Sequence, residues 1–214
     1  MGLKLGLIDY GMGNLHSVES SLLRLTQPCQ RIQTLKALHG CDALILPGVG
    51  SFDPAMENLS ATGLIPHIKE WVHNNKPLLG ICLGLQLLFE SSSEGSQEGL
   101  GLLQGHVERL PDNQDERIPH MGWSQLNCQR PSPLLPARQS APWMYFVHSY
   151  AAVPAERDVL AATTGFGDQD ITAMVWNKRL GACQFHPEKS SDSGAKMLER
   201  WLAWLQNQPR STST

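Results

Sequence analysis

Short apolar runs alternate with helical patterns from Leu3 to Phe89, and this alternation restricts the fold more than any other feature. Leu3–Ile8, Cys41–Leu46 and Pro77–Ile81 have the length and continuous apolar character of buried strands. Each run is followed by apolar residues at helical spacing: Leu15, Val18, Leu22 and Leu25; Leu64, Ile65, Ile68, Trp71 and Val72; and 85–89. Strands that alternate with helices predict an α/β fold with a mostly parallel sheet covered on both faces.

The second half of the chain predicts loops and an added antiparallel section. Ser91–Gly101, Pro111–Glu116 and Pro131–Pro142 are polar or proline-rich and indicate loops. Strands are predicted at Met144–Val147, Asp170–Trp176 and Leu180–Phe185, the last two joined as a hairpin through 177–179. A final helix is predicted to begin at 191–193, with Met197, Leu198, Trp201, Leu202 and Leu205 on one face. We therefore expect one domain over residues 1–208 and a flexible tail over 209–214.

Composition excludes several classes of function. The chain has 214 residues, a net charge of −3 and no run of basic residues, which argues against a non-specific nucleic-acid binder. No apolar stretch approaches the roughly 20 residues of a membrane span, and the N-terminus lacks the pattern of a signal peptide. The five cysteines form no Cys-x-x-Cys pair, so we expect reduced thiols and no metal site. A cytoplasmic protein is predicted.

Gly80-Ile81-Cys82-Leu83-Gly84 is the sharpest chemical motif. A residue between glycines at i−2 and i+2, where a strand enters a helix, has the pattern of a nucleophile elbow. Such a turn exposes the Cys82 thiol at the sheet edge above a helix N-terminus, which favours the thiolate. The Leu83 amide would donate into an oxyanion hole. A buried structural cysteine is the alternative.

Phe185-His186-Pro187-Glu188 follows a predicted strand and ends at the same sheet edge. In an extended segment the i, i+2 spacing would direct both side chains the same way, with Pro187 fixing the backbone between them. Glu188 could then bond one ring nitrogen of His186 while the other faces Cys82, as in a Cys–His–Glu triad. The alternative is a surface turn.

Pro47-Gly48-Val49-Gly50 follows the strand expected beside the elbow strand. Its glycines would let backbone amides approach a bound carbonyl and supply a second oxyanion donor. They would also let the Gly48–Val49 peptide reorient, so that a resting state holds the Val49 amide away from the reacting carbonyl. The alternative is a plain glycine turn, and no Gly-Lys-Ser/Thr phosphate loop is present.

These motifs resemble class I (triad) glutamine amidotransferases, which have a flavodoxin-like fold. Further segments resemble the glutaminase subunits of imidazole glycerol phosphate synthases, of histidine biosynthesis: Asp9–Leu15, Pro47–Phe52, His120–Trp123, Tyr145–Tyr150 and His186–Ser190. The resemblance extends from residue 4 to about residue 205. Ser124 and Ser191 depart from the family pattern, which often has Asn and Gln there.

The resemblance implies that Cys82, His186 and Glu188 hydrolyse L-glutamine to glutamate and ammonia without a cofactor. It implies an oxyanion hole at Gly48, Val49 and Leu83, and glutamine binding by Gly50, Gln86, Ser149 and Tyr150. Ammonia would pass to a (βα)₈-barrel cyclase subunit in a heterodimer, which makes imidazole glycerol phosphate and an aminoimidazole carboxamide ribonucleotide. Asn14, Trp123 and Lys189 would face that partner.

Three other functions remain open from the sequence. One is the glutaminase subunit of another class I amidotransferase, serving anthranilate or pyridoxal phosphate synthesis. Another is a cysteine hydrolase of similar fold, and the third is a non-catalytic regulatory subunit. Turnover of glutamine and labelling of Cys82 by a glutamine-like electrophile would separate these functions.

Overall fold

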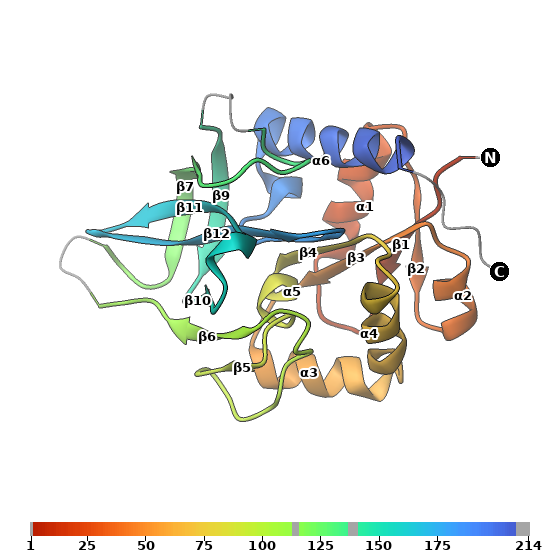
Figure 1. The fold of residues 1–214 in the computed structure, drawn as a ribbon, viewed down its shortest axis with the longest axis horizontal. Coiled ribbons are helices and arrows are strands. Elements are labelled where there is room, and N and C mark those ends of the chain that lie inside the picture. The colour runs from red at the N-terminus through yellow and green to blue at the C-terminus, as the bar shows by residue number, and fades with distance from the viewer. Residues whose placement is uncertain (1, 113–115, 137–140, 209–214) are drawn as a thin grey trace.

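The central feature of the molecule, described here from a computed structural model that covers residues 2–112, 116–136 and 141–208, is an eight-stranded mixed sheet (Figure 1). Its strand order is β2-β1-β3-β4-β13-β12-β11-β8. The strands are β1 (Leu5–Ile8), β2 (Cys29–Ile32), β3 (Ala43–Gly48), β4 (Leu78–Cys82), β8 (Asn127–Cys128), β11 (Leu160–Phe166), β12 (Gln169–Asn177) and β13 (Leu180–Cys183). Neighbours from β2 to β13 pair in parallel, and β12, β11 and β8 extend the sheet antiparallel. The predicted α/β class, parallel with an antiparallel section, is confirmed.

Helices cover both faces of the parallel part of the sheet. In Figure 1, α1 (Leu15–Arg24) and α6 (Ser191–Gln206) lie on one side, and α3 (Phe52–Ala61) and α4 (Ile65–His73) on the other. The short α2 (Leu35–His39) packs near the β2 edge. This layering explains why the strands have continuous apolar sequences, since a strand buried on both faces alternates between two cores.

Strand β3 illustrates the two cores. Leu44 and Leu46 belong to the cluster that includes α3 and α4, whereas Ala43 and Ile45 belong to the cluster that includes α1 and α6. All four side chains are fully buried. Because each core is filled from the sheet and from a helix layer, the carboxyl ends of the strands are held at one rigid edge.

Two small sheets lie beside the antiparallel end. A three-stranded sheet has the order β10-β6-β5, and β7 pairs with β9 in a two-stranded unit that we name the β7–β9 ribbon. Their bounds are β5 (Ser91–Ser92), β6 (Gly105–Arg109), β7 (His120–Gln125), β9 (Trp143–His148) and β10 (Tyr150–Pro154). The ribbon's residues alternate, so that one face packs inward and the other is exposed.

The helix predicted over 85–89 is wrong in its extent. Helix α5 spans only Leu83–Gln86, a single turn. The carbonyls of Leu87, Leu88 and Phe89 accept hydrogen bonds from the backbone of 100–103 instead of continuing the helix. The end of the loop predicted over Ser91–Gly101 is therefore folded against the residues that follow α5, and the loop contains β5.

Other predicted segments shift at their ends or lie outside the described residues. The strand predicted at Leu180–Phe185 ends at Cys183. The 3₁₀ helix η2 follows it at Pro187–Lys189, and another 3₁₀ helix, η1, spans Arg157–Val159. The tail 209–214 lies outside the described part of the chain, as do 113–115 and 137–140 of two predicted loops. In the described ranges, no helix is long and apolar enough to cross a membrane.

Candidate active site

Cys82 occupies a sharp turn between β4 and α5. Its backbone has φ 54° and ψ −112°, a conformation that costs free energy in any residue with a side chain. A Cβ at Gly84 would lie 1.9 Å from the Leu46 carbonyl oxygen, and one at Gly80 would lie 2.9 Å from the Gly84 oxygen. Both flanking positions therefore require glycine, as the elbow motif predicts.

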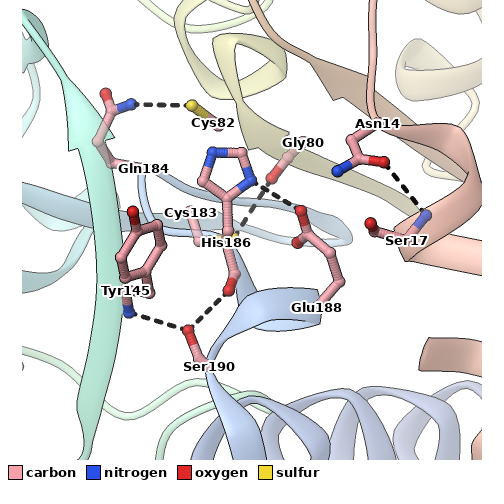
Figure 2. Close-up of polar contacts among 10 residues, drawn as sticks. All are labelled: Asn14, Ser17, Gly80, Cys82, Tyr145, Cys183, Gln184, His186, Glu188 and Ser190. Carbon is pink, nitrogen blue, oxygen red and sulfur yellow. Dashed lines mark hydrogen bonds and ion pairs between the residues drawn. The ribbon is translucent and has the colours of Figure 1, made fainter. Parts of the chain in front are cut away.

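His186 and Glu188 form a buried pair beside this turn (Figure 2). His186 Nδ1–H donates to Glu188 Oε1 at 2.7 Å, and each side chain is only 2% exposed. The predicted contact is present, but the segment is not extended as expected. The 3₁₀ turn of η2 directs the Glu188 side chain back to the ring of His186, the residue before the turn.

The second ring nitrogen of His186 lies on the side of Cys82 (Figure 2). His186 Nε2 is buried and has no hydrogen-bond partner among the described residues, and the same holds for Glu188 Oε2. Burial alone would lower the pKa of His186, but contact with Cys82 and Glu188 outweighs it and raises the pKa to about 10. The ring is thus a strong base directed at the sulfur.

Cys82 opens onto a pocket of about 280 Å³. The lining residues are Val49, Gly50, Cys82, Leu83, Gln86, Glu94, Pro119, Val147, His148, Ser149, Tyr150 and His186. This set contains each residue predicted to bind glutamine. The pocket is near the lower end of the roughly 300–1,000 Å³ range of small-ligand sites, which suits one amino acid.

Gly48 does not line the pocket but lies directly behind it, paired with Cys82 across β3 and β4. A Cβ at Gly48 would lie 2.8 Å from Leu83 Cβ and 2.8 Å from Tyr10 Oη. Tyr10 Oη donates to the Pro47 carbonyl at 2.8 Å and so braces this turn. The glycine turn and the elbow are adjacent, as predicted.

Gln86 is held by internal contacts. Its Nε2 donates to the Tyr150 carbonyl at 2.9 Å and to Gln184 Oε1 at 3.1 Å. Both amide hydrogens are therefore used within the protein, and the Gln86 oxygen is the part of the amide left for a ligand.

Glu94 is a pocket residue that the sequence argument missed. Its Oε2 accepts from the Phe52 amide at 2.9 Å, at the first turn of α3. Asp53 of the same turn accepts from the amides of Ser96 and Gln97. The loop and α3 are therefore joined by a carboxylate from each of them. Glu94 lies in a segment whose polar composition predicted only a loop, and no local signal marked it.

Two histidines of the β7–β9 ribbon form a hydrogen-bonded chain that begins at His148 in the pocket wall. His148 Nδ1–H donates to the Tyr150 carbonyl at 2.8 Å, so its Nε2 accepts from His120 Nδ1–H at 3.1 Å. His120 Nε2 then accepts from Ser124 Oγ at 2.8 Å, which gives this departure from the family pattern a structural role. Burial lowers the pKa of His148 to about 3, so the ring stays neutral.

The residues predicted to face a partner have separate positions. Asn14 caps α1 by accepting from the Ser17 amide at 3.3 Å. Lys189 is exposed between the buried Glu188 and Ser190, and Ser191 is exposed at the start of α6. Trp123 lies on the exposed face of the β7–β9 ribbon, with Met121 63% and Trp143 54% exposed.

Metal binding has no support in the described residues. No group of three or more His, Cys, Asp or Glu side chains there could hold a metal ion. The five cysteines all lie in the described ranges, and each is a free thiol.

Comparison with known proteins identifies relatives over nearly the whole chain. Residues 7–204 match the family Glutamine amidotransferase class-I. The chain is 65% identical over 206 residues to imidazole glycerol phosphate synthase subunit HisH 2 of Parasynechococcus marenigrum (strain WH8102), covering 96% of this chain and 97% of the relative. It is 62% identical over 205 residues to subunit HisH of Prochlorococcus marinus (strain MIT 9211), covering 96% of each chain.

Solved structures agree on the fold. A crystal structure of a glutamine amidotransferase superposes with a TM-score of 0.74 at 22% identity, covering 95% of this chain and 99% of that one. The structure of PurLQS from Thermotoga maritima gives 0.73 at 18% identity, covering 96% and 100%. The elbow, the buried His–Glu pair and these relatives lead to one conclusion: the chain belongs to the class-I glutamine amidotransferase family, among the HisH subunits of imidazole glycerol phosphate synthase.

Proposed function

We propose that Cys82, His186 and Glu188 are the catalytic triad of a glutaminase that supplies ammonia to a cyclase partner. The observation that carries this assignment is the buried His186–Glu188 pair, at 2.7 Å, beside a strained cysteine that opens onto a pocket. A carboxylate that fixes Nδ1–H leaves Nε2 free to exchange a proton with sulfur and then with the leaving group.

The first half of the reaction breaks the amide bond. The Cys82 thiol gives its proton to His186 Nε2, and the sulfur attacks the side-chain carbonyl carbon of glutamine. The tetrahedral intermediate collapses with cleavage of the C–N bond, while Nε2–H protonates the leaving nitrogen and ammonia departs. Glu188 stabilises the ring while it is charged.

The second half hydrolyses the glutamyl thioester. Water gives a proton to His186 Nε2 and its oxygen attacks the thioester carbon. The C–S bond breaks, glutamate leaves, and the proton returns to Cys82. Amides of Leu83 and Val49, beside Gly48, would stabilise the oxyanion of both intermediates, since both residues line the pocket.

The remaining pocket groups suit the charged end of glutamine. Glu94 is the carboxylate among the lining residues and would accept from the α-ammonium group. Gly50, Gln86, Ser149 and Tyr150 surround the same cavity and would fix the α-carboxylate and orient the substrate. Binding at both ends would hold the amide carbon against Cys82.

The exposed face of the β7–β9 ribbon suits a large apolar partner. Met121, Trp123 and Trp143 are 49–63% exposed, a concentration of apolar side chains that is typical of an interface. Val147 of the same ribbon lines the pocket, so a partner seated here would lie next to the site of ammonia release. The relatives are named as subunits of imidazole glycerol phosphate synthase. We infer a heterodimer with the (βα)₈-barrel cyclase of that synthase, in which Asn14, Trp123 and Lys189 contact the partner. We also infer that this chain is a cytoplasmic protein with a single domain over residues 1–208.

The test compares two nitrogen sources in the assembled complex. Cys82→Ala should abolish glutamine-dependent synthesis, by at least about 10³-fold, and leave ammonia-dependent synthesis within about twofold. Cys183→Ala is the matched control, because Cys183 is a buried thiol close by that does not line the pocket. Loss of both activities in a folded, assembled Cys82→Ala complex would overturn the division of labour.

A further inference from the structure

Gln184 is a fully buried polar side chain directed at the Cys82 sulfur (Figure 2). Gln184 Nε2 lies 3.8 Å from Cys82 Sγ, within the range of an N–H···S hydrogen bond. On its other side, Gln184 Oε1 accepts from Gln86 Nε2 at 3.1 Å. Gln184 is therefore a bridge between the pocket wall and the sulfur, and the mechanism above does not use it.

The hydrogen-bond network fixes which end of the Gln184 amide faces the sulfur. The Tyr150 carbonyl can only accept, so the Gln86 group 2.9 Å away must be the donating NH₂. That same NH₂ group faces Gln184, which must therefore present its oxygen to Gln86. The Gln184 NH₂ is left on the side of Cys82. A flipped amide at either residue would set donor against donor or acceptor against acceptor in a buried site.

We infer that Gln184 is a positioning residue of the glutaminase reaction, whose amide N–H donates to Cys82 Sγ and stabilises the thiolate in the orientation for attack. This inference rests on the proposed function, because it assumes that Cys82 is the nucleophile. Gln184 acts through Cys82 and does not line the pocket, so it makes no contact with substrate.

Charge explains why a glutamine is useful at this position. A thiolate is a stronger hydrogen-bond acceptor than a thiol, so the N–H donor favours the charged form of the sulfur. His186 Nε2 faces the same sulfur as a donor once it holds the proton, and a neutral amide does not compete with it for that proton. The two donors together would fix the sulfur in a turn where the backbone already restricts it.

The alternative is that Gln184 only fills buried space between β13 and the pocket. Gln184→Met separates the two roles, because it keeps the length of the side chain and removes the N–H. A filler role predicts a change in stability alone. A positioning role predicts a change in the pH dependence of sulfur reactivity, measured in chain that remains folded.

The experiment follows alkylation of Cys82 by iodoacetamide as a function of pH, with the modified residue identified by peptide mass spectrometry. We expect Gln184→Met to move the midpoint of this profile upward by about one pH unit, and so to slow alkylation at neutral pH roughly tenfold. In the assembled complex, kcat for glutamine should fall by a similar factor.

Gln30→Met is the matched control. Gln30 Nε2 donates to Cys41 Sγ at 3.2 Å, which is the same kind of contact far from the site. This variant should leave the alkylation profile of Cys82 and the glutaminase rate unchanged. A shift of equal size in both variants would overturn the inference, and so would an unshifted Gln184→Met profile.

A measurement on the unaltered chain covers the case in which Gln184→Met does not fold. The side-chain amide NMR signal of Gln184 in isotope-labelled protein should titrate with the same midpoint as Cys82 alkylation. It should lose that titration in Cys82→Ala. An amide signal that is insensitive to the state of the sulfur would overturn the inference.

Failure of the proposed function would look different from failure of this inference. A chloroketone analogue of glutamine should alkylate Cys82 in the wild-type chain, which tests the nucleophile without involving Gln184. If Cys82 is not modified, the proposed function fails. If Cys82 is modified and Gln184→Met behaves as the wild type, only the role of Gln184 fails.

Discussion

The carbonyl oxygen of Leu46 approaches the backbone of Gly84 so closely that a Cβ at residue 84 would lie 1.9 Å from it. Gly84→Ala must therefore separate β3 from the elbow. We expect a loss of at least about 2 kcal/mol in the free energy of unfolding, measured by urea denaturation. Gly165→Ala is the control, because a Cβ there meets no atom within 4 Å. Equal midpoints for the two variants would contradict the tight approach.

The His186–Glu188 contact predicts which of two substitutions lowers the glutaminase rate more. His186→Ala removes the group proposed to move the proton, whereas Glu188→Gln keeps a side chain beside Nδ1 and removes its charge. Glutaminase kcat should fall further in His186→Ala, with Glu188→Gln retaining a measurable fraction. Steady-state rates with saturating glutamine in the complex measure the order. The reverse order would remove Glu188 from the proposed triad.

Val49 offers a test of the predicted switch in the glycine turn. Val49→Pro removes the amide that would donate to the oxyanion, and loss of one such donor typically slows catalysis by ~10²–10³-fold. We expect the cyclase partner, with its nucleotide bound, to activate the glutaminase by reorienting the Gly48–Val49 peptide. Val49→Ala keeps the amide and should retain this activation. The Val49 side chain is 37% exposed, so neither substitution leaves a cavity in the core. Full activation of a folded Val49→Pro complex would exclude this amide as the switch.

His148 predicts a loss of stability in mild acid. Burial dominates, and together with smaller effects of its neighbours it lowers the pKa of His148 to about 3 in the folded chain, against about 6.5 when unfolded. The unfolded chain therefore gains a proton below about pH 6.5 that the folded chain does not take. Lowering the pH from 7 to 5 should cost about 2 kcal/mol through this residue.

His148→Asn tests that assignment, because the Asn amide can still donate to the Tyr150 carbonyl but does not titrate. The free energy of unfolding of the variant, measured at several pH values, should change less between pH 7 and 5 than that of the wild type. Parallel curves would show that His148 does not account for the acid sensitivity.

Lys189 lies exposed directly after Glu188, the buried carboxylate of the proposed triad, which predicts a role in coupling the two subunits. Lys189→Ala should raise the glutamine consumed per product formed and leave Cys82 alkylation intact. Lys196→Ala, at an exposed position on α6, is the control and should keep the ratio of the wild type. An unchanged ratio in Lys189→Ala would show that this lysine does not couple the two subunits.

The parallel half of the fold could be predicted because its signals are local. Strands such as β3 and β4 are buried on both faces, so their continuous apolar sequences are visible without knowledge of their neighbours. Strand β2 lies at the sheet edge with Gln30 and Arg31 exposed, and β11 contains only Ala, Thr and Gly between Leu160 and Phe166. Both were missed, since their pairing depends on partners distant in the sequence.

In the candidate site, too, local motifs could be predicted from the sequence and tertiary contacts could not. The elbow and the His-Pro-Glu segment are short motifs whose glycines and spacing are specific. Glu94 and Gln184 gave no such signal, because the position of Glu94 depends on a folded loop and that of Gln184 on a contact with Gln86, which is distant in the sequence. Side chains brought together by tertiary structure are invisible to a reading of local patterns.

The backbone conformation at Cys82 serves the proposed chemistry and lowers the stability of the fold at the same residue. Glycine adopts φ 54°, ψ −112° without the penalty that a side chain imposes, so a chain selected only for resistance to unfolding would replace this cysteine. If Cys82 is the nucleophile, as proposed, the more stable chain would be inert. Thermostable variants that remain active must therefore gain their stability elsewhere, in the two cores that hold the elbow, while this turn keeps its unfavourable geometry.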